Sequence, residues 1–158
     1  MANPRIDELR KKLDKEPGSR LFAQLAEELR KEGELEEAIQ VARDGLKKHP
    51  NYPSARITLG RALLDTGDLA AAKAEFETVL KAAPDNIVAS RYLAECLEGL
   101  GDIEGATGRY KLTLQLAPGD KQASSRLHAM EHRGPSAVAA PAPSPPAAPQ
   151  TPSPAAAT

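Results

Sequence analysis

The sequence predicts an all-α domain built from repeated helix pairs, and composition and one internal period support this fold class. Aromatic residues make up 3% of the 158 residues and there is no Trp. A β-sandwich or barrel usually draws its core from aromatic and β-branched side chains. Ala and Leu, two strong helix formers, dominate here instead. Pro50, Pro84 and Pro118 follow one another at intervals of 34 residues, which indicates a repeated structural unit.

Small, apolar and helix-ending residues recur at the same positions of three successive 34-residue units, with no insertion between the units. We call each such set of three equivalent residues a column. One column could arise by chance, but many columns in the same register could not. Besides the prolines, the columns are Leu25, Leu59, Leu93; Ala26, Gly60, Ala94; Leu29, Leu63, Leu97; Gly33, Gly67, Gly101; Leu35, Leu69, Ile103; Ala38, Ala72, Ala106; Ala42, Phe76, Tyr110; and Leu46, Leu80, Leu114.

The second copy shows how the first helix of a unit is built. Leu59 and Leu63 lie four residues apart and therefore share one helical face. Gly60 lies beside them, where another backbone could approach closely. Gly67 suits the left-handed end of this helix, and Asp68 suits the N-cap of the next one.

The second helix of the unit carries Ala72, Phe76 and Leu80, which recur every four residues as an apolar stripe. Pro84 ends this helix, because Pro cannot continue a helix and restricts the residue before it. Each helix is too short to bury its apolar face alone. Stacked units are therefore expected to bury one continuous core.

The pattern Leu-Gly-x-x-Leu…Gly-Asp…Ala-x-x-x-Phe…Pro at this period resembles the tetratricopeptide repeat (TPR) family. The resemblance implies a short right-handed solenoid of antiparallel helix pairs. The family's aromatic residue early in the first helix appears once, as Phe22, and Arg56 and Ser90 replace it elsewhere, which predicts weaker local packing. The three units are residues 19–52, 53–86 and 87–120.

The third unit is expected to be the least stable of the three. Gly105 and Gly108 both fall within its second helix. Each costs about 1 kcal/mol of helix stability relative to Ala.

Further helices are expected at both ends of the stack. An Asn-Pro pair at the start predicts a helix over residues 4–16 that covers the first repeat. Asp120 is expected to cap a last helix over residues 120–133. His128 stands there in the column of small residues, which fits a terminal helix with a polar outer face. The TPR domain would then span residues 1–133.

Residues 134–158 differ sharply in composition from the rest of the chain. They contain eight Pro and nine Ala and no charged side chain, and such a segment cannot bury enough apolar surface to offset its ordering entropy. A disordered C-terminal tail is predicted. It could serve as a tether, or a stretch such as Pro143-Ser144-Pro145-Pro146 could bind a Pro-recognising domain.

The charge balance gives no electrostatic reason to expect nucleic acid or an anionic membrane as the main partner. The chain has 21 basic and 22 acidic residues and a formal net charge of −1. No run approaches the ~20 apolar residues of a membrane span, and the N-terminus lacks the apolar segment of a signal peptide. A cytoplasmic location is expected. The Ala-, Pro- and Arg-rich composition resembles that of proteins from GC-rich bacteria.

The sequence indicates no chemistry beyond binding. Cys96 is the single cysteine and is expected to be a small, semi-buried hydrophobe. His128 and His132 could hold a metal ion from two sides, but no third ligand is near in sequence. There is no Gly-rich phosphate loop and no Ser/His/Asp set. We therefore expect no catalytic residue, no metal and no cofactor.

The resemblance implies that the first helices line a concave groove, which is the usual ligand surface. Arg61 and Arg91 stand at its centre among apolar residues, which suits a peptide or helix with an apolar anchor and a carboxylate, since Arg grips a carboxylate bidentately. Alternatively, Arg61 is paired within the groove. The expected lining residues are Arg20, Ala23, Glu27, Ser54, Ile57, Arg61, Leu64, Val88, Arg91, Tyr92 and Glu95, with Arg30 and Glu98 following on the same faces.

These features predict a non-enzymatic adaptor or scaffold that binds a partner peptide or helix in the groove. The alternative is a structural subunit of a larger assembly, joined through the stack ends or the convex face, with the tail as a tether; self-association stays open. Chaperone C-terminal tails are not expected as ligands. The Lys and Asn residues that clamp such tails are replaced by Ala23, Glu27 and Thr58.

Overall fold

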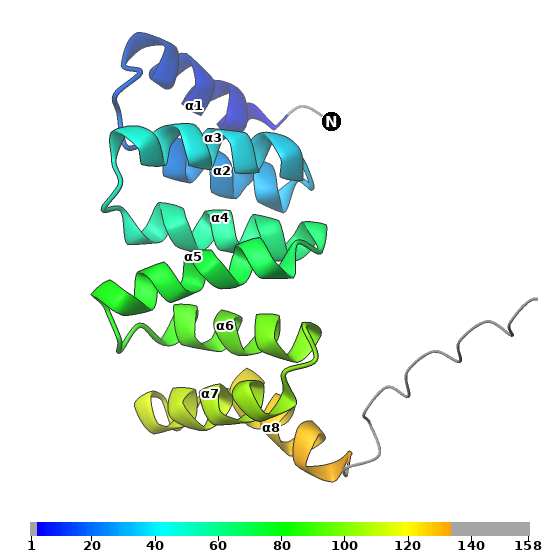
Figure 1. The fold of residues 1–158 in the computed structure, drawn as a ribbon. Helices are drawn as coiled ribbons and strands as arrows, with labels where there is room; N and C mark the ends of the chain where they lie inside the picture. The colour runs from blue at the N-terminus through cyan, green and yellow to red at the C-terminus, as the bar shows by residue number, and fades with distance from the viewer. Residues whose placement is uncertain (1–2, 134–158) are drawn as a thin grey trace, which may run out of the picture.

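The computed structural model describes residues 3–133, so the tail predicted over 134–158 lies outside the described residues. Within the described part the chain is all-helical, and the helices are stacked in chain order (Figure 1). This confirms the predicted fold class. The helices are α1 (Pro4–Lys15), α2 (Phe22–Lys31), α3 (Leu35–Lys48), α4 (Pro53–Thr66), α5 (Leu69–Ala82), α6 (Ile87–Gly99), α7 (Ile103–Leu116) and α8 (Lys121–His132).

The turn inside each helix pair has a glycine in the left-handed conformation, as the sequence predicts. A residue with a Cβ would be strained at these positive φ angles. The helix that follows is capped in the second and third pairs, where Asp68 and Asp102 accept a backbone N–H at 3.2 and 2.9 Å. Glu34, at the same position of the first pair, makes no side-chain cap hydrogen bond. The turn glycines are Gly33 (φ 83°), Gly67 (φ 87°) and Gly101 (φ 85°).

In the first and second units, a glycine on one helix of the pair leaves space for an aromatic ring from the other helix of the same pair. A Cβ on Gly60 would lie 2.7 Å from the ring of Phe76, which is fully buried. The space beside Gly60, where the sequence allowed a close approach of another backbone, is filled by this ring. In the first unit the roles are reversed, and Phe22 of α2 occupies the space beside Gly45 of α3.

The second and third units lack the family's aromatic residue early in the first helix, and polar pairs take its place there. In the third unit the hydroxyls of Ser90 and Thr113 lie 2.8 Å apart, and both side chains are fully buried. In the second unit Arg56 Nη1 donates to Glu75 Oε2 at 2.7 Å. The positions without the family aromatic thus keep specific contacts between α6 and α7 and between α4 and α5.

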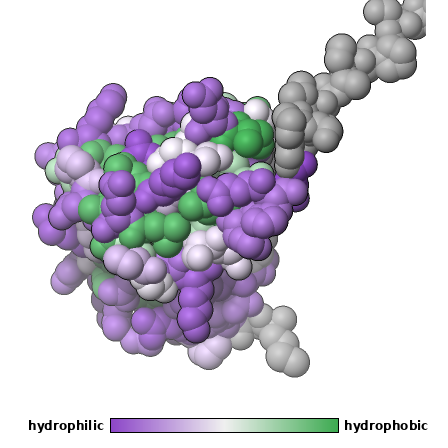
Figure 2. Space-filling view, turned by 90° about the horizontal axis from the view of Figure 1, so that it is seen from below, coloured by the Kyte–Doolittle hydropathy of each residue, from purple (hydrophilic) through white to green (hydrophobic). Residues whose placement is uncertain are grey.

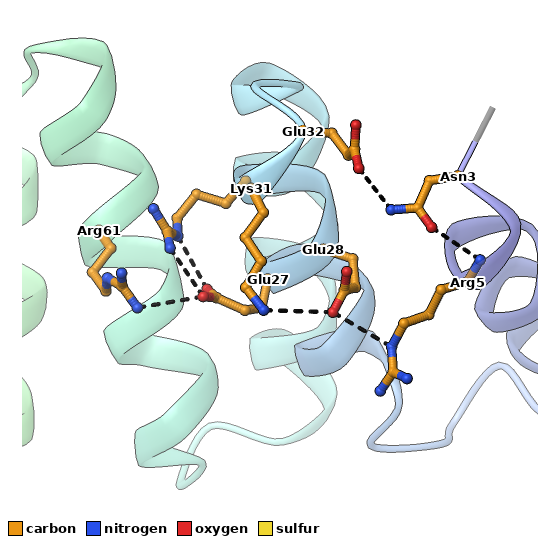
Figure 3. A network of polar contacts seen from close by, with 8 residues as sticks. Asn3, Arg5, Glu27, Glu28, Lys31, Glu32 and Arg61 are labelled. Carbon is orange, nitrogen blue, oxygen red and sulfur yellow. Dashed lines mark hydrogen bonds and ion pairs between the residues drawn. The ribbon is translucent and has the colours of Figure 1, made fainter. Parts of the chain in front are cut away.

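Helix α1 covers the first unit through an apolar face and polar contacts at its edge. Ile6 and Leu9 are buried, and Asn3 Nδ2 donates to Glu32 Oε1 at 2.8 Å (Figure 3). Asn3 also accepts a hydrogen bond at the helix start, which confirms it as the N-cap. The helix ends at Lys15, one residue before the predicted end.

Helix α8 closes the other end of the stack with a polar outer side. Ala123 and Met130 are buried, whereas His128 is exposed. Nδ1 of His132 lies 2.8 Å from the carbonyl oxygen of His128, so this ring interacts with the helix C-terminus. Seen from this end, the surface is largely hydrophilic and is broken by hydrophobic patches (Figure 2). These observations fit the predicted terminal helix, whose regular part is 121–132.

Burial makes Cys96 chemically inert at neutral pH. Its side chain is fully buried in α6, and burial raises the pKa of the thiol to about 12. Within residues 3–133, no three His, Cys, Asp or Glu side chains are grouped so that they could hold a metal ion. None of the described helices is both long and apolar enough to span a bilayer.

Gly108 offers a direct test of the prediction that its glycines lower the stability of the third unit. It is exposed on α7, and a Cβ added there would meet nothing within 4 Å. The second unit carries Ala74 at this position. Gly108→Ala is expected to raise the free energy of unfolding by about 1 kcal/mol, because Ala loses less backbone entropy in a helix than Gly. Urea denaturation followed by circular dichroism measures the change.

Gly67→Ala is the matched control with the opposite expected sign. An added Cβ at Gly67 also has open space, but the φ of 87° forces a left-handed conformation that costs about 1 kcal/mol with a side chain. If Gly108→Ala leaves the urea midpoint unchanged, helix propensity does not limit the stability of the third unit.

Candidate partner-binding face

The first helices of the three units present their polar side chains to one side of the stack. Contacts between these side chains connect α2 with α4, α4 with α6, and α6 with α8. We call this surface the first-helix face. Its members are Glu27, Arg30, Ile57, Arg61, Leu64, Val88, Arg91, Tyr92, Glu95 and Glu98, with Asp65, Asp120, Gln122 and Arg126 at its border.

A network of four charges links the first and second units. Arg30 donates twice to Glu27, at 3.0 and 3.1 Å, and its Nη1 donates to Asp65 at 2.9 Å. Arg61 Nη1 reaches the same Glu27 carboxylate at 3.3 Å (Figure 3). Burial alone would raise the pKa of Glu27, but Arg30 and Arg61 hold it below its usual range. These four charges therefore compensate one another inside the protein.

Tyr92 joins the second and third units at the centre of the face. The guanidinium carbons of Arg61 and Arg91 lie 5.1 and 5.2 Å from its ring centroid, within the range of a cation–π interaction. Phe76 stacks on the same ring with centroids 5.6 Å apart. Arg91 Nη1 also donates to Asp120 at 3.0 Å. Both arginines are thus held by neighbouring side chains, as in the alternative that the sequence left open for Arg61.

Asp120 contributes to this face in a way that the sequence did not reveal. Its Oδ1 accepts the Ala123 N–H at 2.9 Å, which confirms the predicted N-cap, and its Oδ2 pairs with Arg91. Burial alone would raise the pKa of Asp120, but these two donors hold it below its usual range. The repeat gave no signal for the pair, because the second unit has Ile57 and Asn86 at the equivalent positions.

Glu95 is placed differently from the other charged residues of the face. It is half-buried, it accepts a hydrogen bond from Gln122 Nε2 at 3.1 Å, and it makes no ion pair with any residue of 3–133. Burial raises its pKa, and the nearby Glu98 adds to this, while Arg126 and other arginines oppose it. Glu27 stands two repeats earlier in the same column, yet its pKa shifts in the opposite direction.

Apolar positions of the face lie between the charged ones. Val88 is 40% exposed. Ile57 and Leu64 are half-buried and pack against the core, and Ser54 is exposed at the start of α4. The face therefore offers apolar surface beside its central aromatic ring.

One expected lining residue, Ala23, is buried, whereas another, Arg20, is exposed beside Tyr52. Ala23 is only 8% exposed and offers little surface to a ligand. Arg20 precedes the first turn of α2, and its guanidinium carbon lies 5.6 Å from the ring centroid of Tyr52. Thr58, on α4, is 8% exposed.

Solved structures with a similar fold include MamA from Desulfovibrio magneticus RS-1, with 23% sequence identity over 81% of this chain and 73% of that chain, and a TM-score of 0.76. The first TPR of Spaghetti (RPAP3), bound to the HSP90 peptide SRMEEVD, is 18% identical over 72% of this chain and 90% of that chain, with a TM-score of 0.69. The second TPR domain of human RPAP3, in complex with the HSP70 peptide SGPTIEEVD, is 20% identical over 70% and 92%, with a TM-score of 0.66.

No curated protein sequence matches the chain. The tetratricopeptide repeat model matches residues 29–87 and 63–131, which together cover well over half of the chain. The matched stretches include α3 to α7 and the turn glycines at positions 33, 67 and 101. The chain therefore belongs to the tetratricopeptide repeat family.

Proposed function

We propose that this protein is a non-enzymatic adaptor or scaffold whose first-helix face binds a peptide or helix of a partner protein. The observation that carries the proposal is the cluster of Arg61, Tyr92 and Arg91, which is held by internal contacts beside exposed apolar surface. The family consists in general of protein-interaction modules, and the similar RPAP3 domains bind peptides. A cytoplasmic location remains a prediction.

The physical properties of the cluster suit a binding anchor. Tyr is enriched among the residues that dominate binding energies at protein interfaces, and the two arginines serve to hold its ring in place. Tyr92 is fixed by Phe76 and by two guanidinium groups. A partner that binds there orders few side chains, and this lowers the entropic cost of association.

Chaperone tails remain unexpected ligands for this face. The peptides bound to the two RPAP3 domains end in Glu-Glu-Val-Asp and are therefore acidic at that end. Here such a peptide would meet Glu27 and Glu95, and no Lys or Asn stands at the clamp positions. Ala23 and Thr58 at two of these positions are themselves buried.

Val88→Glu tests the proposed function without disturbing the internal ion pairs. Charge reversal of Arg61 or Arg91 would place like charges against Glu27 and Asp120, so it would confuse binding with folding. Val88 is 40% exposed, and a carboxylate there would have to lose its hydration when a partner covers it. Affinity capture from the native lysate is expected to recover the main partner about tenfold less well with Val88→Glu.

Thr78→Glu is the matched control, because Thr78 is exposed on α5, a second helix. Circular dichroism should give the same helical signal for the native protein and both variants. Equal recovery of every partner with Val88→Glu and the native protein would contradict binding at the first-helix face.

A second candidate function is assembly through the second helices, and two exposed leucines favour it. Leu112 and Leu116 lie one turn apart on α7 and are 39% and 40% exposed. The first unit carries Asp44 and Lys48 at these positions. The second unit carries Thr78 and Ala82 there. The third unit therefore has the most apolar outer edge of the three, which could pack against another subunit.

Leu112→Glu/Leu116→Glu tests this second candidate. If α7 forms an interface, the double variant is expected to sediment as a smaller species than the native protein at the same concentration. A native protein that sediments as a monomer and co-purifies with no complex would argue against assembly through α7.

A further inference from the structure

Nearly all charges of the first-helix face are compensated within the protein. Arginine and carboxylate partners lie 2.9 to 3.4 Å apart, and each pair connects neighbouring turns or neighbouring helices. Such charges are poor grips for a ligand, because a ligand must first displace their internal partner. The compensated groups are Glu27 with Arg30 and Arg61, Asp65 with Arg30, Asp120 with Arg91, and Glu98 with Arg126.

Glu95 is the exception on this face. Its carboxylate is half-buried and has one amide donor, Gln122, but no cationic partner within ion-pair distance among residues 3–133. Arg61 of α4, Arg91 of α6 and Arg126 of α8 lie near enough to act on it, but each already has its own carboxylate. A partly buried charge without a counter-ion is costly, so a cationic group brought to this position would be bound favourably.

The surroundings of Glu95 suit a long basic side chain. Ile57, Leu64 and Val88 supply apolar surface on the same face, and Lys and Arg place their aliphatic stems along such surfaces while the charged head stays polar. Val88 lies seven residues before Glu95 on the same helix, which corresponds to about 10 Å along the axis. In an extended chain, residues three apart span about the same distance.

Building on the proposed function, we infer that the partner segment carries a Lys or Arg whose cationic head pairs with the Glu95 carboxylate. An apolar side chain about three residues away, if the segment is extended, covers Val88. The sequence alone predicts the opposite charge on the partner, namely a carboxylate bound between Arg61 and Arg91. The structure disfavours that arrangement because Glu27 and Asp120 already occupy those arginines.

A stability measurement separates a binding role of Glu95 from a structural one. The folded-state pKa of Glu95 is raised, so the stability that its neutral form contributes is complete below the unfolded pKa of about 4.3 and is lost as the pH rises through the folded pKa. Glu95→Gln imitates the neutral form. Its urea midpoint should equal or exceed that of the native protein at pH 7, and the two midpoints should converge near pH 4.

The binding test uses the full chain and a defined probe. Random dodecapeptides are selected by display on the native protein, and the enriched sequences are synthesised with their basic residue intact or replaced by Gln. Fluorescence anisotropy then measures Kd for the native protein, for Glu95→Gln and for the control Glu77→Gln. Glu77 is an exposed carboxylate on α5, so this control makes the same change in net charge away from the face.

We expect the enriched peptides to share a basic residue. Its replacement, or Glu95→Gln, should weaken binding about tenfold, because a charge-assisted pair is lost. Combining both changes should cause little further loss, since they remove the same interaction. Glu77→Gln should bind as the native protein does.

Other results would overturn the inference. Peptides that bind through an acidic residue, with Val88→Glu weakening them and Glu95→Gln not, would assign the opposite polarity and leave the proposed function intact. If the chain forms a dimer that cannot bind the peptides, the first-helix face is an interface between two copies of the chain, and the inference is wrong. Peptides indifferent to both Val88→Glu and Glu95→Gln, or a failure to enrich any peptide, would overturn the inference and the proposed function together.

Discussion

The stack depends on how the two helices of each unit share a fixed interior volume. Protein interiors are close-packed, so an aromatic ring can come from either helix only if the other gives way. Phe22 takes the space beside Gly45 in the first unit, and Phe76 takes the space beside Gly60 in the second. The ring changes its helix of origin, yet the pair stays closely packed. Successive first helices therefore remain in phase, and this brings their side chains to one surface.

The local features of the fold could be predicted because each depends on residues close together in the chain. A glycine tolerates the left-handed turn, an aspartate caps the helix after it, and a proline follows the helix end. These requirements repeat every 34 residues and were visible as columns. The ring of Phe76 over Gly60 was not, because the sequence indicates where a small residue stands without indicating what fills the space. The pair of Arg91 and Asp120 was missed for a related reason, since the third unit alone carries it.

The sequence predicted that the side chains of the first-helix face share one side of the stack, and this is what the structure shows, but it gave a different account of their charges. From the sequence, Arg61 and Arg91 are expected to bind a ligand carboxylate, because they stand among apolar residues. In the structure Arg61 pairs with Glu27 of the preceding unit, and Arg91 pairs with Asp120, the residue that caps α8. One column, with Glu27, Arg61 and Glu95 in successive repeats, already contained this information. Groups of opposite charge in neighbouring repeats can pair with each other in the absence of a ligand. Arg61 pairs with Glu27, and Glu95, the third residue of the column, is left without a counter-ion.

Asp120 has a consequence for the last helix of the stack. Terminal elements of a repeat protein have neighbours on one side only and tend to open before the centre. The start of α8 is capped by the same side chain that holds Arg91, and Arg126 of α8 holds Glu98. Docking of α8 and the arrangement of the face are therefore thermodynamically linked. A ligand that prefers the arrangement with α8 docked would slow amide exchange throughout α8, even in turns that the ligand never touches.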